Sequence, residues 1–302
     1  MKVVEQLVSN LQNTPNPSST FDSDFHNVFA RLQYLVGDCQ RSRQVVIDHV
    51  HSMLRPALYK RAMYKHMWEW PLGYVGDFQI IDWTYTKQLD QDPVGKAWDE
   101  FYHRQAAPQA VRNRKDYLVD LFGKMCRAKG AGIRMLDVAS GPCRDVAEAV
   151  AAAGEAARGS IVHCVDIDER AVAYAKGIVA GLDHSTTFRW QVANALRLRL
   201  RETYDLVWSA GLFDYLDDRF AASLLSRLWQ WTAPGGTFCV GNFHLDNPSR
   251  LWMEFCAKWN LLHRSDADML RLAEMASIPV ECVRLDKEPL GVVVFLLADK
   301  PL

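Results

Sequence analysis

The sequence predicts an α/β fold built on a doubly wound, nucleotide-binding sheet. The first indication is the apolar run Arg134–Val138, which stops at the small residues 139–141 and leads into an amphipathic helix. The second is the apolar run 161–165, which ends in Asp166 and also precedes a helix. A small-residue turn followed by an acid at the tip of the next strand is how such sheets hold a nucleotide.

Length and composition favour a soluble globular protein. The 302 residues are 49% hydrophobic and 24% charged, which is ample for a packed core. A formal net charge of −1 gives no overall field for nucleic acid or an anionic membrane. Residues 1–6 lack the apolar core of a signal peptide, and no run approaches the ~18 apolar residues of a membrane span. We therefore expect a cytoplasmic monomer or homodimer with a small-molecule substrate and no nucleic-acid or membrane partner.

The seven cysteines show no C-x-x-C pair, and most lie in apolar patterns. They are expected to be reduced, buried small hydrophobes. No metal site is expected.

Residues 1–130 are predicted to form a helical lid or cap. The spacing of apolar residues predicts a short helix over 1–12 and a long or broken helix from Phe21 to about Leu58, ended by Pro56. A further helix over 108–129 leads to the first strand.

Residues 131–302 are predicted to hold the sheet. After the first two strands, the predicted strands are Thr187–Ala195, Tyr204–Gly211, Thr237–Gly241, Val280–Leu285 and Val292–Leu297. Predicted helices separate them at 169–181, 220–232, 248–262 and 265–276, and Ala233–Gly236 is predicted to be a turn. The last two strands are expected to pair as a hairpin. The residues after the fourth and fifth strands are expected at the carboxyl edge, the functional edge of such a sheet.

The turn after the first strand lacks the dinucleotide fingerprint G-x-G-x-x-G. Its small positions fall at Ala139, Gly141 and Cys143, of which one is glycine. Asp137 followed by small residues at alternate positions resembles the first motif of class I S-adenosylmethionine-dependent methyltransferases, where a helix N-terminus meets a carboxylate. The stretch 193–198 is similar to the family pattern G-D-A-x-x-L, with Asn194 in the place of the acid.

Longer phrases resemble one bacterial methyltransferase group, which makes the extracellular factor 3-hydroxypalmitic acid methyl ester. They are Pro71–Asp77, Ala139–Pro142, Ser209–Tyr215 and Gly241–His244, followed by 247–250 and Trp259. The similarity covers about residues 65–300. It implies a class I methyltransferase (Rossmann-like) fold, with a seven-stranded, mostly parallel sheet whose last strand is antiparallel, and S-adenosyl-L-methionine as cofactor.

The resemblance also implies cofactor contacts, position by position. Asp137 closes the first strand beside the turn that meets the methionine portion, which is Ala139, Ser140 and Gly141. Asp166 would meet the ribose, Ile167 the adenine face, and Asn194 with Ala195 the adenine edge. Ser209, Ala210 and Gly211 would flank the sulfonium, and Tyr74 with Asp77 would cap it.

An aromatic lid over the sulfonium makes physical sense. Residues 59–102 hold nine of the chain's twenty Trp and Tyr residues. Pro71, Gly73 and Gly76 surround Tyr74. Aromatic faces attract cations, and methyl transfer benefits from excluded water. Aromatic residues at helical spacing are also the usual pattern of a core.

The predicted function is direct in-line methyl transfer to a small-molecule acceptor, such as a carboxylate or hydroxyl of a secondary or signalling metabolite. A sulfonium methyl is already activated, so positioning supplies most of the rate. A base is needed only for a protonated acceptor; His244 is the first candidate, followed by Asp214 and Tyr215. Two alternatives stay open: a cyclase that converts the cofactor into azetidine-2-carboxylate and methylthioadenosine, and a non-catalytic cofactor-binding protein.

Overall fold

The computed structural model describes residues 40–130, 132–182 and 185–302, with the single positions 5, 27 and 34. The helix predicted over 1–12 and the start of the one predicted from Phe21 lie outside these residues. The chain divides into a helical unit, residues 1–109 with 248–260, and a sheet unit, residues 110–247 with 261–302. The sequence placed a boundary at 130, whereas this division falls at 109 and gives 248–260 to the helical unit.

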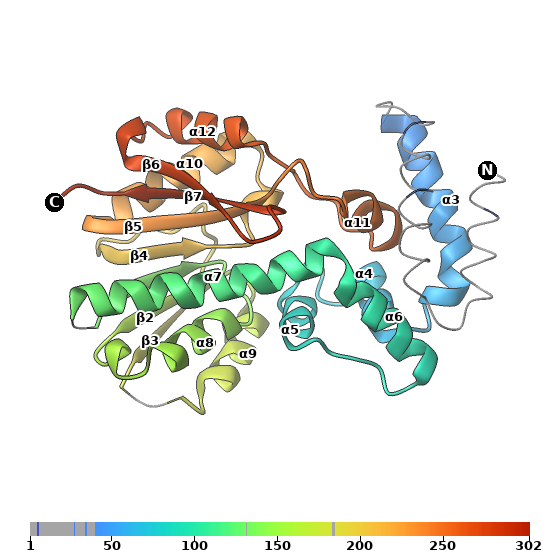
Figure 1. Ribbon diagram of the computed structural model, residues 1–302, viewed down its shortest axis with the longest axis horizontal. Coiled ribbons are helices and arrows are strands. Elements are labelled where there is room, and N and C mark those ends of the chain that lie inside the picture. Colours follow the sequence, from blue (N-terminus) through green and yellow to red (C-terminus); the bar gives the residue numbers. More distant parts are fainter. Residues whose placement is uncertain (1–4, 6–26, 28–33, 35–39, 131, 183–184) are drawn as a thin grey trace. The chain divides into compact units, whose positions relative to one another are not determined.

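The helical unit is built from short helices. They are α3 (Gln40–Leu58), α4 (Ala62–Glu69), α5 (Phe78–Thr86), α6 (Pro93–Arg104), α11 (Arg250–Cys256) and the first residues of α7 (Ala106–Lys129) (Figure 1). Pro56 lies inside the last turn of α3, and the helix ends at Leu58, as predicted. Proline has no backbone N–H to donate to the preceding turn, and the helix continues for only two residues beyond it.

The segment 248–260 completes the core of the helical unit. Trp252 is 2% exposed, and its ring centroid lies 5.4 Å from that of Tyr102. Trp68 Nε1 donates to the Cys256 carbonyl at 2.6 Å. Aromatic residues predicted at helical spacing therefore form a core here, and residues distant in sequence supply part of it.

The sheet unit holds seven strands in the order β3-β2-β1-β4-β5-β7-β6 (Figure 1). They are β1 (Arg134–Val138), β2 (Ile161–Asp166), β3 (Thr187–Val192), β4 (Tyr204–Ser209), β5 (Thr232–Phe243), β6 (Val283–Lys287) and β7 (Val293–Asp299). Strands β1 to β5 pair in parallel, whereas β7 is antiparallel to both β5 and β6. The doubly wound sheet, its antiparallel last strand and the hairpin-like final pair are confirmed.

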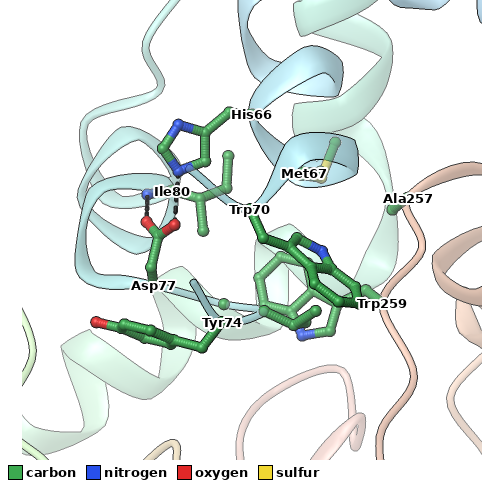
Figure 2. A pocket seen from close by; sticks show the side chains of 10 residues that line it. His66, Met67, Trp70, Tyr74, Asp77, Ile80, Ala257 and Trp259 are labelled. Atoms are coloured by element: carbon green, nitrogen blue, oxygen red, sulfur yellow. Dashed lines mark hydrogen bonds and ion pairs between the residues drawn. The ribbon is translucent and has the colours of Figure 1, made fainter. Parts of the chain in front are cut away.

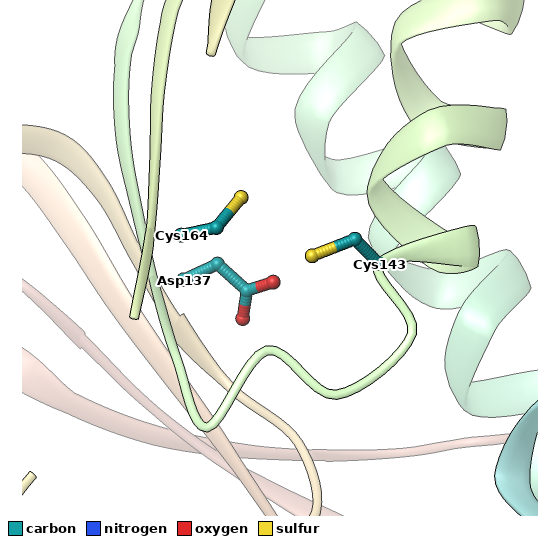
Figure 3. A group of neighbouring side chains, drawn as sticks. All are labelled: Asp137, Cys143 and Cys164. Carbon is teal, nitrogen blue, oxygen red and sulfur yellow. The ribbon is translucent and has the colours of Figure 1, made fainter. Parts of the chain in front are cut away.

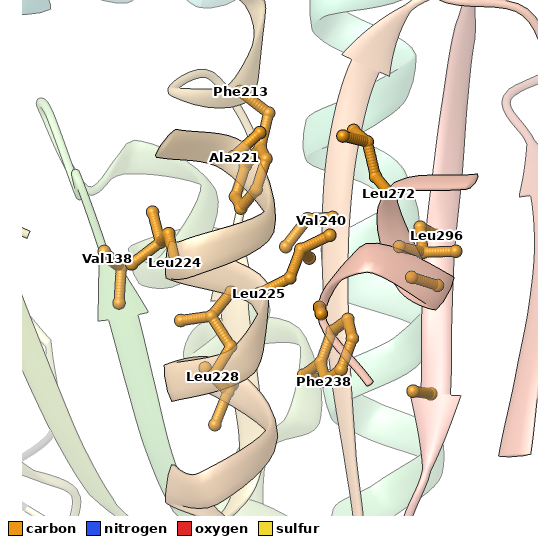
Figure 4. Packing of buried hydrophobic residues seen from close by; sticks show 14 of the residues in the cluster. Val138, Phe213, Ala221, Leu224, Leu225, Leu228, Phe238, Val240, Leu272 and Leu296 are labelled. Atoms are coloured by element: carbon orange, nitrogen blue, oxygen red, sulfur yellow. The ribbon is translucent and has the colours of Figure 1, made fainter. Parts of the chain in front are cut away.

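Helices cover both faces of the sheet. On one face, α10 (Asp218–Trp231) and α12 (Asp266–Met275) pack a large apolar cluster against alternate strand residues such as Val207 and Val240 (Figure 4). Residues next to these in sequence point to the other face. There Tyr117 of α7 stacks on Phe295, with centroids 4.0 Å apart. Helices α8 (Arg144–Ala153) and α9 (Glu169–Val179) follow β1 and β2.

Strand β5 starts earlier than predicted. The predicted turn Ala233–Gly236 lies inside the strand, because Tyr204 pairs with Thr232 and Leu206 with Thr237. The extra residues form a bulge, with Gly235 at φ 73°. A side chain at Gly236 would place its Cβ 2.8 Å from the Asp205 carbonyl oxygen, which explains the glycine.

Strands β3 and β4 end earlier than predicted, at Val192 and Ser209. Residues 193–195 and 210–211 therefore lie in loops at the carboxyl edge. Among the described helices, none is both long and apolar enough to cross a membrane.

Candidate functional site

The turn between β1 and α8 has an unusual backbone. Ala139, Gly141 and Cys143 all have positive φ, at 58°, 54° and 53°. Residues other than glycine rarely adopt this conformation, and such strain gathers at ligand sites. A Cβ built on Gly141 would meet no atom within 4 Å, so the turn leaves open space at this position.

Asp166 at the tip of β2 holds this turn in place. Its Oδ2 accepts from Gly141 N at 2.8 Å and its Oδ1 from Asp168 N at 2.9 Å. Burial raises the pKa of the Asp166 carboxyl, opposed by these backbone hydrogen bonds. Each carboxylate oxygen keeps a second lone pair, so the side chain can still accept from a pair of ligand hydroxyls.

Asp137 and Ser140 add polar atoms without partners. Asp137 Oδ2 and Ser140 Oγ are buried and have no hydrogen-bond partner among the described residues. Burial, followed by the nearby Asp145 and Asp166, raises the pKa of Asp137 well above its usual range. Asp137 Oδ2 is thus an unused buried acceptor near Asp145 and Asp166, which fits a ligand that brings a cationic or hydroxyl group.

Two thiols lie beside Asp137. The Sγ atoms of Cys143 and Cys164 and a carboxylate oxygen of Asp137 lie within 4.8 Å of one another (Figure 3). Cys143 belongs to the turn, whereas Asp137 and Cys164 are paired residues of β1 and β2. The prediction of buried, reduced cysteines is met at these positions, since both are free and fully buried.

The tips of β2 and β3 present apolar surface and one amide. Ile167 is 64% exposed and Val192 52% exposed, which is high for aliphatic side chains. Asn194 Oδ1 accepts from Leu196 N at 2.9 Å, and the preceding residue, Ala193, donates its N–H to the Asp166 carbonyl. The exposed Ile167 can stack on a flat ligand ring, and Ala195 lies within the same turn.

The tip of β4 is tied to its neighbours. Ser209 is fully buried and its Oγ donates to the Val138 carbonyl at 2.9 Å. Arg114 of α7 donates to the Ala210 carbonyl at 2.7 Å. A Cβ on Gly211 would lie 3.3 Å from the same guanidinium. The side chain of Ser209 thus links β4 to β1, Ala210 is buried, and Gly211 is half-buried.

Arg264, which the sequence gave no reason to select, organises the loops after β4 and β5. Its guanidinium is buried and donates to the carbonyls of Phe213 and Leu216 and to Asn242 Oδ1 at 2.8, 2.5 and 2.7 Å. It also pairs with Asp218 at 3.0 Å. A planar, five-donor group suits this task because it can bond several carbonyls at once.

Of the three predicted bases, Asp214 is buried and Tyr215 is 41% exposed. Asp214 Oδ1 accepts from Phe243 N at 2.7 Å, and burial raises the pKa of its carboxyl to about 6. His244 is 6% exposed. Its Nδ1 accepts from Asp246 N at 3.2 Å, and its Nε2 lies 3.3 Å from Asp266 Oδ1. Nδ1 of His244 is thus bonded within its own loop, whereas Nε2 lies next to Asp266, the first residue of α12.

The two predicted capping residues belong to the helical unit. Asp77 begins α5, since its Oδ1 accepts from Gln79 N and Ile80 N at 3.0 and 3.1 Å. Its Oδ2 lies 2.7 Å from His66 Nε2 in a buried pair. Tyr74 is 37% exposed on the turn that this pair holds, and it lines a small pocket with Trp70 and Trp259 (Figure 2).

Comparison with known proteins supports a class of enzyme. A methyltransferase domain model matches residues 135–236, which run from β1 into β5. A search of curated proteins found no match. A possible exported protein from Bordetella parapertussis has a similar structure, with a TM-score of 0.63 and 19% identity over 100% of this chain and 94% of that one.

Two methyltransferase structures are more distant. Magnesium protoporphyrin IX methyltransferase from Synechocystis, with bound SAH, has a TM-score of 0.49 and 14% identity over 67% of this chain and 92% of that one. The 1,6-didemethyltoxoflavin-N1-methyltransferase of Burkholderia thailandensis has a TM-score of 0.44 and 17% identity over 61% and 79%.

The matched domain covers the unusual turn and the strand tips that carry the carboxylates. Together with the seven-stranded sheet, it supports a methyltransferase.

Proposed function

We propose that this protein transfers the methyl group of S-adenosylmethionine to a small-molecule acceptor by direct in-line displacement. The observation that carries the proposal is the Asp166–Gly141 hydrogen bond, which joins a buried carboxylate to a strained turn with open space above it. A carboxylate at the second strand tip, beside small residues at the first, is what a nucleoside with ribose hydroxyls requires.

The chain's own residues supply binding and orientation. The carboxylate of Asp166 accepts from the ribose hydroxyls, and Ile167 packs on the adenine face, with Asn194 and Ala195 at its edge. Asp137 and the turn 139–141 hold the methionine portion, where the unpartnered oxygens of Asp137 and Ser140 suit an ammonium group. The backbone of Ser209–Gly211 faces the sulfonium.

S-adenosylmethionine supplies an activated methyl group, so the protein has to position the acceptor and exclude water. An acceptor that is protonated at working pH also needs a base. Asp214 suits this role best, because a carboxyl pKa of about 6 keeps it ionised and still basic near neutrality. His244 and Tyr215, on the neighbouring strand tip and on the same loop, are the further candidates.

We also propose that the turn carrying Tyr74 caps the sulfonium and acts as a lid. Its support is the exposed Tyr74 ring on a turn whose far end is fixed by the His66–Asp77 pair. The Tyr74 face supplies the attraction for a cation, and Asp77 adds a negative charge behind it. Tyr74→Ala should lower turnover with little change in melting temperature, and cofactor should slow hydrogen exchange over 66–86.

The acceptor class follows from the resemblance of residues 65–300 to the group that makes 3-hydroxypalmitic acid methyl ester. We propose a carboxylate or hydroxyl oxygen of a secondary or signalling metabolite as the methyl acceptor. A carboxylate acceptor is already ionised and needs no base, whereas a hydroxyl acceptor does.

The test is incubation of purified protein with S-adenosylmethionine, with and without candidate acceptors, followed by mass spectrometry. S-adenosylhomocysteine that appears only with an acceptor supports transfer. Methylthioadenosine without an acceptor contradicts transfer and supports cyclisation. Calorimetry with Asp166→Ala is the matched binding test: unchanged affinity in a folded variant would remove Asp166 from the site.

A further inference from the structure

We propose that Cys143 and Cys164 form a reversible disulfide beneath the cofactor-binding turn, and that a hydroperoxide oxidant drives its formation. The inference rests on the proposed function for its effect on binding, because Cys143 closes the turn that we assign to the methionine portion. The chemistry of the thiol pair is independent of that assignment.

Geometry makes the pair suitable for a bond. The two Sγ atoms, with a carboxylate oxygen of Asp137, all lie within 4.8 Å of one another. In Figure 3 Cys143 extends from the turn toward the strands that carry Asp137 and Cys164. A disulfide requires a sulfur–sulfur distance of about 2.05 Å, so the turn and β2 must draw closer when the bond forms.

The movement would fall on the turn, because β2 lies inside the sheet between β1 and β3. Cys143 has φ 53° and caps α8. Its N–H donates to the Ser140 carbonyl, and its own carbonyl accepts from Ala147 N. A displacement of Cys143 would therefore also move Ser140 and Gly141 on one side and the start of α8 on the other.

The oxidation balances without any group beyond the peroxide. One thiolate attacks the peroxide oxygen and becomes a sulfenic acid, with release of water or an alcohol. The second thiol then displaces hydroxide from that sulfur, which leaves as water after taking up the thiol proton. The two cysteines together lose two electrons and two hydrogens. A dithiol reductant reverses the reaction through a mixed disulfide.

Burial makes the reaction conditional on opening of the turn. Both thiols are fully buried. The contact with Cys164, followed by burial, raises the pKa of Cys143, and burial raises that of Cys164. Thiols of this kind are unreactive until they reach solvent. A ligand seated on the turn should hold it closed and slow the oxidation.

The test treats the full chain with hydrogen peroxide and follows it by intact and peptide mass spectrometry. We expect loss of two hydrogens and a peptide that links Cys143 to Cys164, formed several-fold more slowly with S-adenosylmethionine present. Calorimetry should then show at least tenfold weaker cofactor binding, restored by dithiothreitol. Cys164→Ala should bind cofactor normally and keep its affinity after peroxide. Cys239→Ala removes another fully buried thiol and should behave like the unaltered protein.

Three results would overturn the proposal. The first is peroxide treatment that yields no 143–164 link while other cysteines oxidise. The second is a link that forms without a change in cofactor affinity. The third is a metal ion that copurifies with the protein and shields both thiols until a chelator removes it. If Cys164→Ala fails to fold, Cys164→Ser takes its place, and the measurement is the absence of the 143–164 linked peptide after peroxide treatment. Failure of the unoxidised protein to bind S-adenosylmethionine would instead refute the proposed function and leave the disulfide testable by mass alone.

Discussion

The two halves of the sheet's carboxyl edge use their polar groups differently. At the tips of β1 and β2, Asp137 and Ser140 keep buried oxygens that have no hydrogen-bond partner in the described part of the chain, and Gly141 leaves open space. At the tips of β4 and β5, the polar groups bond to one another: Ser209 to Val138, and Asp214 to Phe243. The first half is arranged for a ligand, whereas the second is arranged for rigidity.

This difference indicates that the two halves of the edge have separate roles, one in ligand binding and one in rigid positioning. A cofactor is the same in every turnover, so its half of the edge can present unused hydrogen-bond capacity. The segments after β4 and β5 must hold a reacting group still, and Arg264 contributes through four acceptors: two carbonyls of the segment after β4, Asp218 at the start of α10 and Asn242 of β5. Substitutions in the two halves should therefore separate binding from stability.

The largest effect is expected for Arg264→Ala. It leaves the carbonyls of Phe213 and Leu216 without their donor in a buried site, which costs on the order of 3–5 kcal/mol of unfolding free energy. Denaturant unfolding measures it. Arg271→Ala, which removes a 54% exposed side chain paired with Asp218, should cost under ~1 kcal/mol. Equal losses in the two variants would contradict a special role for Arg264.

The next effect is on cofactor affinity. Asp166→Asn keeps the shape of the side chain but replaces one acceptor with an amide donor, which faces either Gly141 N or Asp168 N and leaves one acceptor fewer for the ligand. Bonds to a charged group contribute about 1.5–3 kcal/mol each, so affinity should fall at least tenfold by calorimetry. Asp168→Asn, two residues on and paired with Arg170, should change affinity less than threefold. Similar losses at both positions would place the ribose elsewhere.

Asp214→Asn should move stability and activity in opposite directions. Its carboxyl has a pKa of about 6 when folded and about 3.9 when unfolded. The folded state therefore holds the extra proton between these values, and stability falls as pH rises through 6. Removing the buried charge should raise unfolding free energy by about 2 kcal/mol at pH 7.5 and by much less at pH 4.

Activity should show the reverse dependence. A carboxylate base must be ionised, so turnover of the unaltered protein should rise with pH through about 6, and Asp214→Asn should lose this rise. If turnover of the variant keeps the same pH profile, Asp214 is a structural carboxyl and the base lies elsewhere.

The smallest effect is expected for Ile167→Ser. The side chain is 64% exposed, so its removal should leave stability nearly unchanged. Loss of apolar contact with a flat ring should weaken cofactor binding by about 1 kcal/mol, or fivefold. Val280→Ser, at an 80% exposed position, serves as the control with no expected change in affinity.

The same contrast explains what the sequence could predict. The β1 turn is local: Asp137, the small residues and Pro142 are neighbours in the chain, so their pattern is readable. The antiparallel final strand was implied by the family resemblance, not by the strand pattern. The β5 bulge was not predicted, because Pro234 and two glycines are typical of a turn. Their place in the strand depends on pairing with Tyr204, 30 positions earlier.

The hydrogen bonds at the tips of β4 and β5 were harder to predict, because they join residues far apart in the sequence. Arg264 lies 48 residues from Leu216, one of the carbonyls it holds. Nothing in its neighbours marks it as buried. His244 and Asp77 were selected as polar residues in turns, and the structure adds their partners: Asp246 and Asp266 for His244, and His66 with the start of α5 for Asp77. The hydrogen-bond partners of these residues determine whether they can bind a ligand, and a single sequence does not identify such partners.

The discontinuous helical unit has a consequence for how the chain is made. Trp252 and Cys256 complete a core whose other members, Tyr102 and Trp68, leave the ribosome well before them. During synthesis, the apolar aromatic surface in the first part of this unit, residues 1–109, stays uncovered until the chain has been extended past residue 260. The N-terminal part of this protein should therefore be the segment that a nascent-chain chaperone protects. A truncated chain that ends before α11 should aggregate, whatever the stability of the finished protein.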